Sequence, residues 1–89
     1  MVYVFVQNKV KDYQAWRRVF ESAEEFRKAN GELSSQIFHV GGDSNSIAGL
    51  FEWDTLENAQ GFFALADLKQ KMVEAGVIGA PSILFLESA

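Results

Sequence analysis

The chain contains one histidine, His39, which is its first candidate for acid–base chemistry. An imidazole titrates near neutral pH, so it can act as a general base or orient a ligand by donating a hydrogen bond. His39 follows Ile37 by two residues, which places both side chains on one face of a strand. The alternative is a strand histidine that forms a hydrogen bond at the sheet edge or faces a partner chain. The sequence leaves both interpretations open.

Two further polar residues adjoin apolar runs. Asn8 follows the first run, where its amide could bind a substrate oxygen; the alternative is a turn residue that satisfies the loop backbone. Glu52 lies among apolar residues, and burial would raise the pKa of its carboxyl group and make it an acid or base. Its alternative is a solvated carboxylate, or one paired with Lys or Arg. We predict His39 and Asn8 as catalytic candidates and Glu52 as a ligand contact.

Aromatic residues make up 13% of the chain and could line a pocket for a planar or polyketide-like ligand. The candidate ligand-binding residues are Trp53, Tyr3, Tyr13 and Trp16. Aromatic residues at core spacing also build ordinary cores, and that interpretation is favoured for Trp16, which lies in the apolar stripe of a helix. Trp53 and Tyr3 each carry a polar group that needs a hydrogen-bond partner.

Several other kinds of site are not predicted. The chain has no cysteine, which excludes disulfides, thiolate catalysis and cysteine-based metal sites, and nothing has metal-ligand spacing. The glycine pair Gly41-Gly42 leads into a strand, so it is a turn and not a phosphate loop. A net charge of −4 without a basic stripe argues against a nucleic-acid partner. We therefore expect neither metal nor organic cofactor.

Length and composition predict one domain over residues 1–89. Hydrophobic residues make up 48% of this small chain, so either the core is dense or apolar surface is reserved for a partner. No apolar run approaches the ~20 residues that cross a bilayer. The first residues lack the basic start of a signal peptide. We expect a cytoplasmic protein with no membrane partner.

Periodicity predicts the elements in order. Residues 2–7 alternate as a strand, with an exit loop over residues 8–11. Asp12 then caps one long amphipathic helix that ends at Asn30-Gly31. Two strands, 37–40 and 47–53, flank the turn and form a hairpin. Residues 55–75 are one bent helix or two short ones, with a break favoured near 64–67. A turn over 78–81 leads to the last strand, 82–87.

The predicted order is β-α-β-β-α-β, the ferredoxin-like α+β arrangement with a four-stranded antiparallel sheet. Both faces of that sheet are apolar: in the first strand, for example, Val4 and Val6 point to one face and Tyr3 and Phe5 to the other. Helices can cover only one face, so another layer must cover the second. We predict a homodimer whose two sheets pack face to face.

The residues that carry a family resemblance are spread over nearly the whole chain: residues 10–16 with Phe20, the turn 43–45, Phe51-Glu-Trp-Asp54, and the tail 72–81 with 85–87. They resemble the dimeric α+β barrel superfamily, in particular small bacterial antibiotic-biosynthesis-monooxygenase-like and cyclase-like proteins of unassigned function. The resemblance implies a pocket between helices and sheet in each protomer. The relatives often carry a histidine at the position of Asn8 and an arginine at that of His39.

Three functions follow as hypotheses. The first is a cofactor-independent monooxygenase- or cyclase-like enzyme that acts on a hydrophobic aromatic or polyketide-like metabolite, with Asn8, His39 and Trp53 as polar contacts. The alternative is a non-catalytic dimeric module that binds a small molecule or serves as an accessory subunit. The third is a haem-binding or haem-degrading variant, since this superfamily hosts several unrelated reactions.

Overall fold

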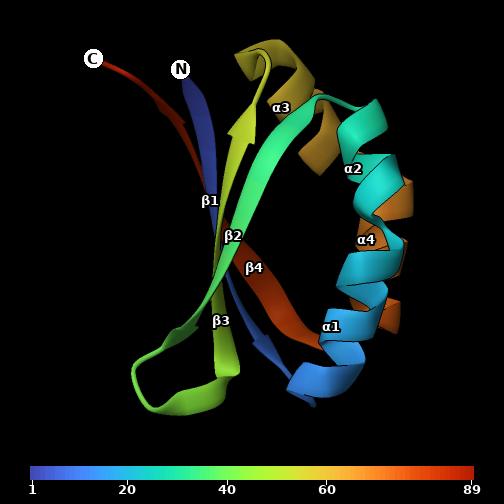
Figure 1. The fold of residues 1–89 in the computed structure, drawn as a ribbon. Coiled ribbons are helices and arrows are strands. Elements are labelled where there is room, and N and C mark those ends of the chain that lie inside the picture. The colour runs from blue at the N-terminus through green and yellow to red at the C-terminus, as the bar shows by residue number, and fades with distance from the viewer.

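The computed structural model describes all 89 residues and has two layers, a sheet and a helical layer (Figure 1). The strands are β1 (Val2–Val10), β2 (Glu32–Val40), β3 (Asp43–Trp53) and β4 (Val77–Glu87). The helices are α1 (Tyr13–Ser22), α2 (Glu24–Ala29), α3 (Leu56–Phe63) and α4 (Ala66–Glu74). All strand pairs are antiparallel, in the order β2-β3-β1-β4. The predicted ferredoxin-like α+β arrangement is confirmed.

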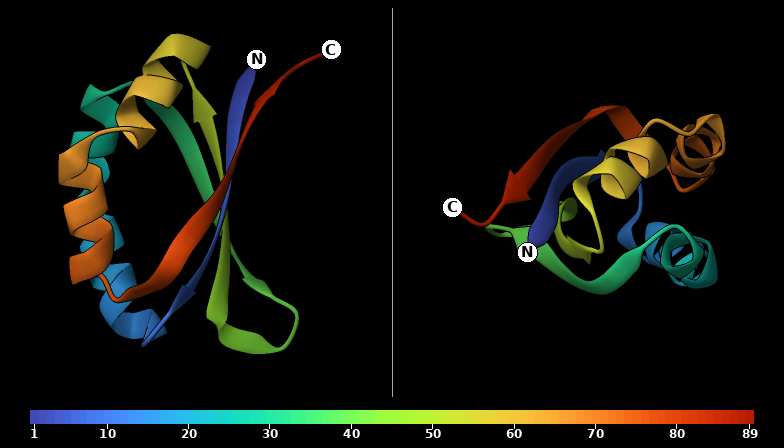
Figure 2. Two further views of the ribbon diagram at one scale, coloured as in Figure 1. Left: turned by 180° about the vertical axis from the view of Figure 1, so that it is seen from behind. Right: turned by 90° about the horizontal axis from the view of Figure 1, so that it is seen from above.

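The four helices lie on one face of the sheet, and the chain leaves the other face uncovered (Figure 2). In β1, Val4 faces Phe51 of β3 and Phe85 of β4 in register. Because side chains alternate along a strand, this row points toward the helices, where Val4 and Phe51 are buried. The core that forms there contains two clusters of buried residues: Val4, Val6, Phe51, Trp53, Ala59 and Phe62, and Val10, Trp16, Ile47 and Ala75.

The first strand is longer than predicted, and this moves Asn8 from a loop into the sheet. Lys9 pairs with Ser46 of β3 on one side and with Ile78 of β4 on the other. A central strand with partners on both sides continues as long as both neighbours do, so β1 ends only at Val10. The predicted exit loop at residues 8–11 was therefore wrong.

The predicted single long helix is also wrong, because the helix breaks at Ala23. This residue has φ −94° and ψ 7°, and its N–H donates to both Val19 and Phe20 carbonyl oxygens. The guanidinium of Arg27 donates to the Phe20 carbonyl oxygen as well, so a side chain of α2 binds a backbone oxygen near the end of α1. The apolar periodicity runs through this point and gives no sign of it.

The other boundaries follow the sequence more closely. The predicted break in the second helical region is confirmed, since α3 ends at Phe63 and α4 begins at Ala66. The expected turn over residues 78–81 is instead an irregular part of β4. Register with β1 shifts there, between Gln7 and Lys9 of the partner strand, and Gly79 has φ 71°. Pro81 is tolerated because β4 is an edge strand.

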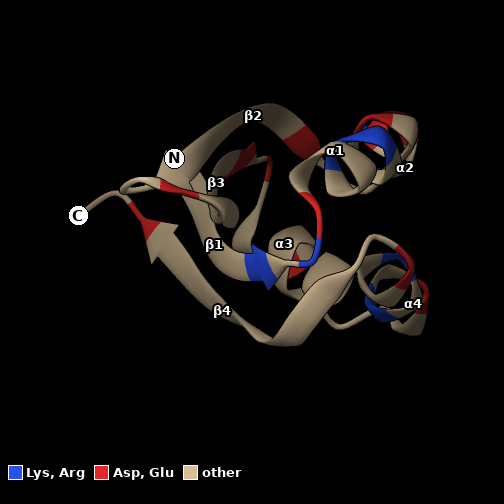
Figure 3. Cartoon of the chain, turned by 90° about the horizontal axis from the view of Figure 1, so that it is seen from below, with Lys and Arg blue, Asp and Glu red and all other residues tan.

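The uncovered face of the sheet is apolar. Register across the central strands pairs Phe5 with Leu50 on β3 and with Leu84 on β4. The large side chains on this face include Leu84, 55% exposed, Phe38, 44% exposed, and Leu86, 43% exposed. Figure 3 shows charged residues mainly along the helices and loops, whereas β4 is uncharged until Glu87. A single copy of the chain leaves this surface in contact with solvent.

Candidate functional site

A small cavity of about 80 Å³ lies between the helices and the sheet. The sheet forms one wall, and α1, α2, α3 and α4 form the other. Its lining has 18 residues, of which 14 are hydrophobic: Val6, Asn8, Trp16, Val19, Phe20, Ala23, Phe26, Arg27, Ile37, Ile47, Gly49, Phe51, Phe62, Phe63, Leu68, Lys71, Met72 and Ala75. Ligand pockets commonly measure about 300–1,000 Å³. A large ligand would therefore have to move the helices or the side chains that fill this space.

Gly49 forms the middle of the sheet wall. A Cβ atom placed on it would lie 2.7 Å from Cε2 of Phe51 and 3.3 Å from Cδ1 of Ile37. The first distance is too short for any real contact, so a side chain here would displace the Phe51 ring. The cavity exists partly because this position has no side chain.

Asn8 is the one uncharged polar side chain in the lining. It is 8% exposed, and its Oδ1 atom is buried with no hydrogen-bond partner. Buried polar groups are nearly always partnered, and an unsatisfied one costs about 1–3 kcal/mol. A hydrogen-bond donor inside the cavity would remove that cost. Asn8 thus leaves a hydrogen-bond acceptor of the cavity lining without a partner in the protein.

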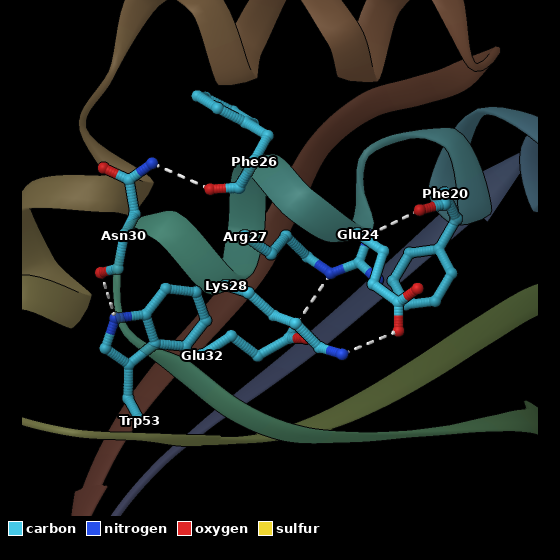
Figure 4. Close-up of polar contacts among 8 residues, drawn as sticks. All are labelled: Phe20, Glu24, Phe26, Arg27, Lys28, Asn30, Glu32 and Trp53. Carbon is cyan, nitrogen blue, oxygen red and sulfur yellow. Dashed lines mark hydrogen bonds and ion pairs between the residues drawn. The ribbon is translucent and has the colours of Figure 1, made fainter.

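Arg27 lines the cavity, and its Nε and Nη1 atoms are bound to other groups of the protein (Figure 4). Its Nε donates to Oε2 of Glu32 at 2.7 Å, and its Nη1 donates to the Phe20 carbonyl oxygen. The guanidinium carbon lies 3.8 Å from the centroid of the Phe20 ring, a cation–π contact. These contacts hold the Arg27 side chain in the cavity wall, next to the helix break.

Glu32 is buried beside Arg27, and its pKa reflects two opposing effects. Burial raises the pKa of the carboxyl group above its ordinary value of 4.5, while the charge and hydrogen bond of Arg27 lower it. Of the flanking charges, Glu24 raises this pKa and Lys28 lowers it. Burial is the larger effect, so the net shift is upward.

Lys71 is the second cation in the lining. Its Nζ atom lies 5.3 Å from the centroid of the Phe26 ring, which is also part of the cavity wall. It forms none of the ion pairs in the structure, which join Arg17 to Glu21, Arg27 to Glu32 and Lys28 to Glu24. The cavity therefore carries one ammonium group without a counterion.

Of the predicted site residues, only Asn8 and Trp16 line the cavity. Trp16 stacks on Phe20 with ring centroids 4.9 Å apart. Tyr13 lies further along α1, with its ring centroid 6.0 Å from Trp16 and 4.5 Å from His39. His39 is exposed on the edge strand β2, and it points to the helical side of the sheet and not to the uncovered face.

The remaining predicted residues lie elsewhere. Trp53 is 1% exposed in the core, and its indole N–H donates to the Asn30 carbonyl oxygen at 2.9 Å (Figure 4). Tyr3 and Glu52 are register partners, and alternation places both on the sheet face away from the cavity. Glu52 there accepts a hydrogen bond from the Ser34 hydroxyl at 3.4 Å.

Sequence reasoning missed both charged lining residues, although a signal for each was present. Arg27 follows Phe20 by seven residues and Ala23 by four, so it occupies the apolar stripe of its helical region. Lys71 follows Leu68 by three residues and precedes Ala75 by four, so it also lies in an apolar stripe. A cation inside an apolar stripe is the pattern that would have found them.

No group of three or more His, Cys, Asp or Glu side chains is arranged to hold a metal ion. No helix has the length and apolar character needed to span a membrane.

The sheet, its single helical layer and the cavity between them define a fold shared with antibiotic biosynthesis monooxygenase structures. SnoaB, a cofactor-independent oxygenase from Streptomyces nogalater, superposes with a TM-score of 0.79 at 12% identity, over 99% of this chain and 92% of that chain. The crystal structure of an antibiotic biosynthesis monooxygenase superposes with a TM-score of 0.74 at 14% identity, over 100% of this chain and 99% of that chain. The structure of a conserved protein from Methanosarcina mazei Go1 superposes with a TM-score of 0.75 at 16% identity, over 99% of this chain and 92% of that chain.

At these identities the similarity shows the fold. No protein-family model matches the sequence, and no curated protein matches it.

Proposed function

We propose that this protein is a cofactor-independent oxygenase-like enzyme for a hydrophobic, aromatic or polyketide-like molecule, which it binds between its helices and its sheet. The observation that carries this proposal is the unpartnered Oδ1 atom of Asn8, a residue that lines a mostly apolar cavity. An apolar pocket with a few convergent polar groups is the usual form of a small-molecule site. Support for the reaction class comes from the fold shared with SnoaB.

Such a reaction needs only molecular oxygen as co-reactant. A substrate CH₂ group loses both hydrogens, one oxygen atom becomes the new carbonyl oxygen, and the other leaves as water. The substrate supplies all the electrons, so the chain's task is to bind, orient and exclude water. Asn8 would hold a substrate hydroxyl through its Oδ1 atom, and Trp16 and Phe20 would contact the ring.

We further propose that two copies associate through the uncovered sheet face. Leu84, Leu86 and Phe38 give this face its exposed apolar surface. Large exposed apolar patches mark interaction sites, and the sheet of a second copy would cover this one.

Oxygen uptake in the presence of dithranol, a dihydroxyanthrone with one oxidisable CH₂ group, tests the oxygenase proposal. We expect uptake above the spontaneous rate, and a decrease of about tenfold in the Asn8→Leu variant, since one hydrogen bond is lost. Lys69→Met is the matched control, because Lys69 is exposed and does not line the cavity. Uptake no faster than without protein would reject catalysis on this class of substrate.

The second candidate is a non-catalytic binding module. It is favoured by the absence of any carboxylate or imidazole from the lining, whose only titratable groups are Arg27 and Lys71. Saturable binding of dithranol without oxygen uptake would select this candidate.

A further inference from the structure

Two cations line the cavity, and the protein supplies a counterion for only one of them. Arg27 is balanced by Glu32, whose carboxylate lies 2.7 Å away and outside the lining. Lys71 has no such partner among the ion pairs. The lining contains no carboxylate. The cavity thus offers one positive charge that the protein does not neutralise.

The position of Lys71 directs this charge toward the cavity. Leu68, three residues earlier on α4, and Ala75, the C-cap residue four positions later, lie on the same side as Lys71 and also line the cavity. The contact of Nζ with the Phe26 ring, 5.3 Å from its centroid, holds the ammonium group beside an apolar wall. Lys71 is half-buried, so an anion here would be screened less than at an open surface.

Asn8 lies on the opposite, sheet side of the same cavity. Its unpartnered Oδ1 atom can accept a hydrogen bond from a ligand donor. The two sides of the cavity can thus bind different groups of a ligand. The sheet side can bind a hydroxyl or N–H group, and the α4 side can bind an anion.

We propose that the cavity ligand is a hydroxylated aromatic carboxylic acid, whose hydroxyl group donates to Asn8 and whose carboxylate pairs with Lys71. This assignment rests on the proposed function, because it takes the same cavity as the ligand site. The volume of about 80 Å³ is below the roughly 150 Å³ of an engineered cavity that takes benzene. Single-ring acids, which demand the least movement of side chains, are therefore the probes of choice.

Three single-ring compounds separate the contributions of the two groups. Para-hydroxyhydrocinnamate carries both groups, para-propylphenol lacks the carboxylate, and hydrocinnamate lacks the hydroxyl. By isothermal titration calorimetry at pH 7, we expect the first to bind about tenfold more tightly than either of the others. Equal affinity for para-propylphenol and para-hydroxyhydrocinnamate would overturn the carboxylate assignment while the ligand cavity stands. Binding of none of the three would reject the acid and the ligand cavity together.

Variants assign each group to its residue. Lys71→Met should weaken para-hydroxyhydrocinnamate about tenfold and leave para-propylphenol unchanged. Lys69→Met, on the same helix but outside the lining, should change neither. Asn8→Leu should weaken both phenols and leave hydrocinnamate unchanged. Undiminished affinity of Lys71→Met for the acid would overturn the proposal, and Lys71→Gln checks the same point with a polar side chain.

Discussion

Arg27 and Glu32 form an ion pair with 2.7 Å between Nε and Oε2, and their side chains are only 8% and 2% exposed. The two residues are five positions apart but belong to different layers, α2 and β2. Their pairing joins the start of the edge strand to the point where the first helical region breaks. A pair this deeply buried is costly to disrupt from one side only, because the remaining charge stays buried alone.

Removal of Glu32 alone should therefore be strongly destabilising. We expect Glu32→Leu to lower the free energy of unfolding by about 3–5 kcal/mol in urea denaturation, and Arg27→Met/Glu32→Leu to recover most of this loss. The exposed pair Lys28–Glu24 provides the control, and Glu24→Gln should cost less than about 1 kcal/mol. A Glu32→Leu variant as stable as the parent would show that the pair contributes nothing.

The pKa of Glu32 makes stability depend on pH. This carboxyl has a raised pKa in the folded state, so the folded chain binds its proton more strongly than the unfolded chain. Its contribution to stability is complete below the ordinary value of 4.5 and is lost as pH rises through the folded-state pKa. Arg27→Met removes the charge that lowers this pKa, so the loss should extend to higher pH. Urea denaturation at several pH values would measure the pH range of this loss of stability in the parent and in Arg27→Met. The same range in both proteins would show that Arg27 does not lower the pKa of Glu32.

The unpartnered amide oxygen of Asn8, which we propose binds the ligand, should lower the stability of the free protein. Asn8→Leu replaces an unsatisfied buried carbonyl by a hydrocarbon of similar shape, and we expect the free energy of unfolding to rise by about 1–3 kcal/mol. Chemical denaturation without ligand would measure this. A loss of stability would mean that a bound water already satisfies Oδ1 in the free protein.

The proposed dimer should depend on the apolar sheet face. Leu84→Lys places a charge at the most exposed large apolar residue of that face, and light scattering after size-exclusion chromatography should report the mass of two chains for the parent and of one for the variant. Val73→Lys, at a residue 71% exposed on α4, should retain the mass of the parent. A single-chain mass for the parent at micromolar concentration would reject the dimer.

His39 should have no effect on binding in the cavity. It is exposed and contacts Tyr13, and it is absent from the lining. We expect His39→Ala to bind para-hydroxyhydrocinnamate with the affinity of the parent in calorimetry. A tenfold weaker affinity would show that the Tyr13 end of α1 closes over the ligand.

The sequence predicts the fold because its strongest patterns are local. Alternation in β1 and the Phe51-Glu-Trp53 segment of β3 identify a sheet with two apolar faces, and Asp12 marks the helix start, where its side chain accepts from the Ala15 N–H. At the break at Ala23, Arg27 donates to the Phe20 carbonyl oxygen, a contact that no periodicity reveals.

The site is harder to predict because it depends on which layer each side chain reaches. Asn8 is a site candidate in the sequence, but the register of β1 with β3 and β4 is needed to direct it toward the helices. Trp53 has the same residue type as Trp16, yet one bonds Asn30 within the core and the other lines the cavity. Such differences arise from pairing between distant segments.

Because Gly49 has no side chain, this position of β3 sets how much room the cavity offers to a ligand. A single methyl group there would lie 2.7 Å from Cε2 of Phe51, so the ring of this lining residue would have to move. We expect Gly49→Ala to change the shape of the cavity without changing its charges. The substitution separates the need for room from the need for polar contacts, since Asn8 and Lys71 would both remain in place.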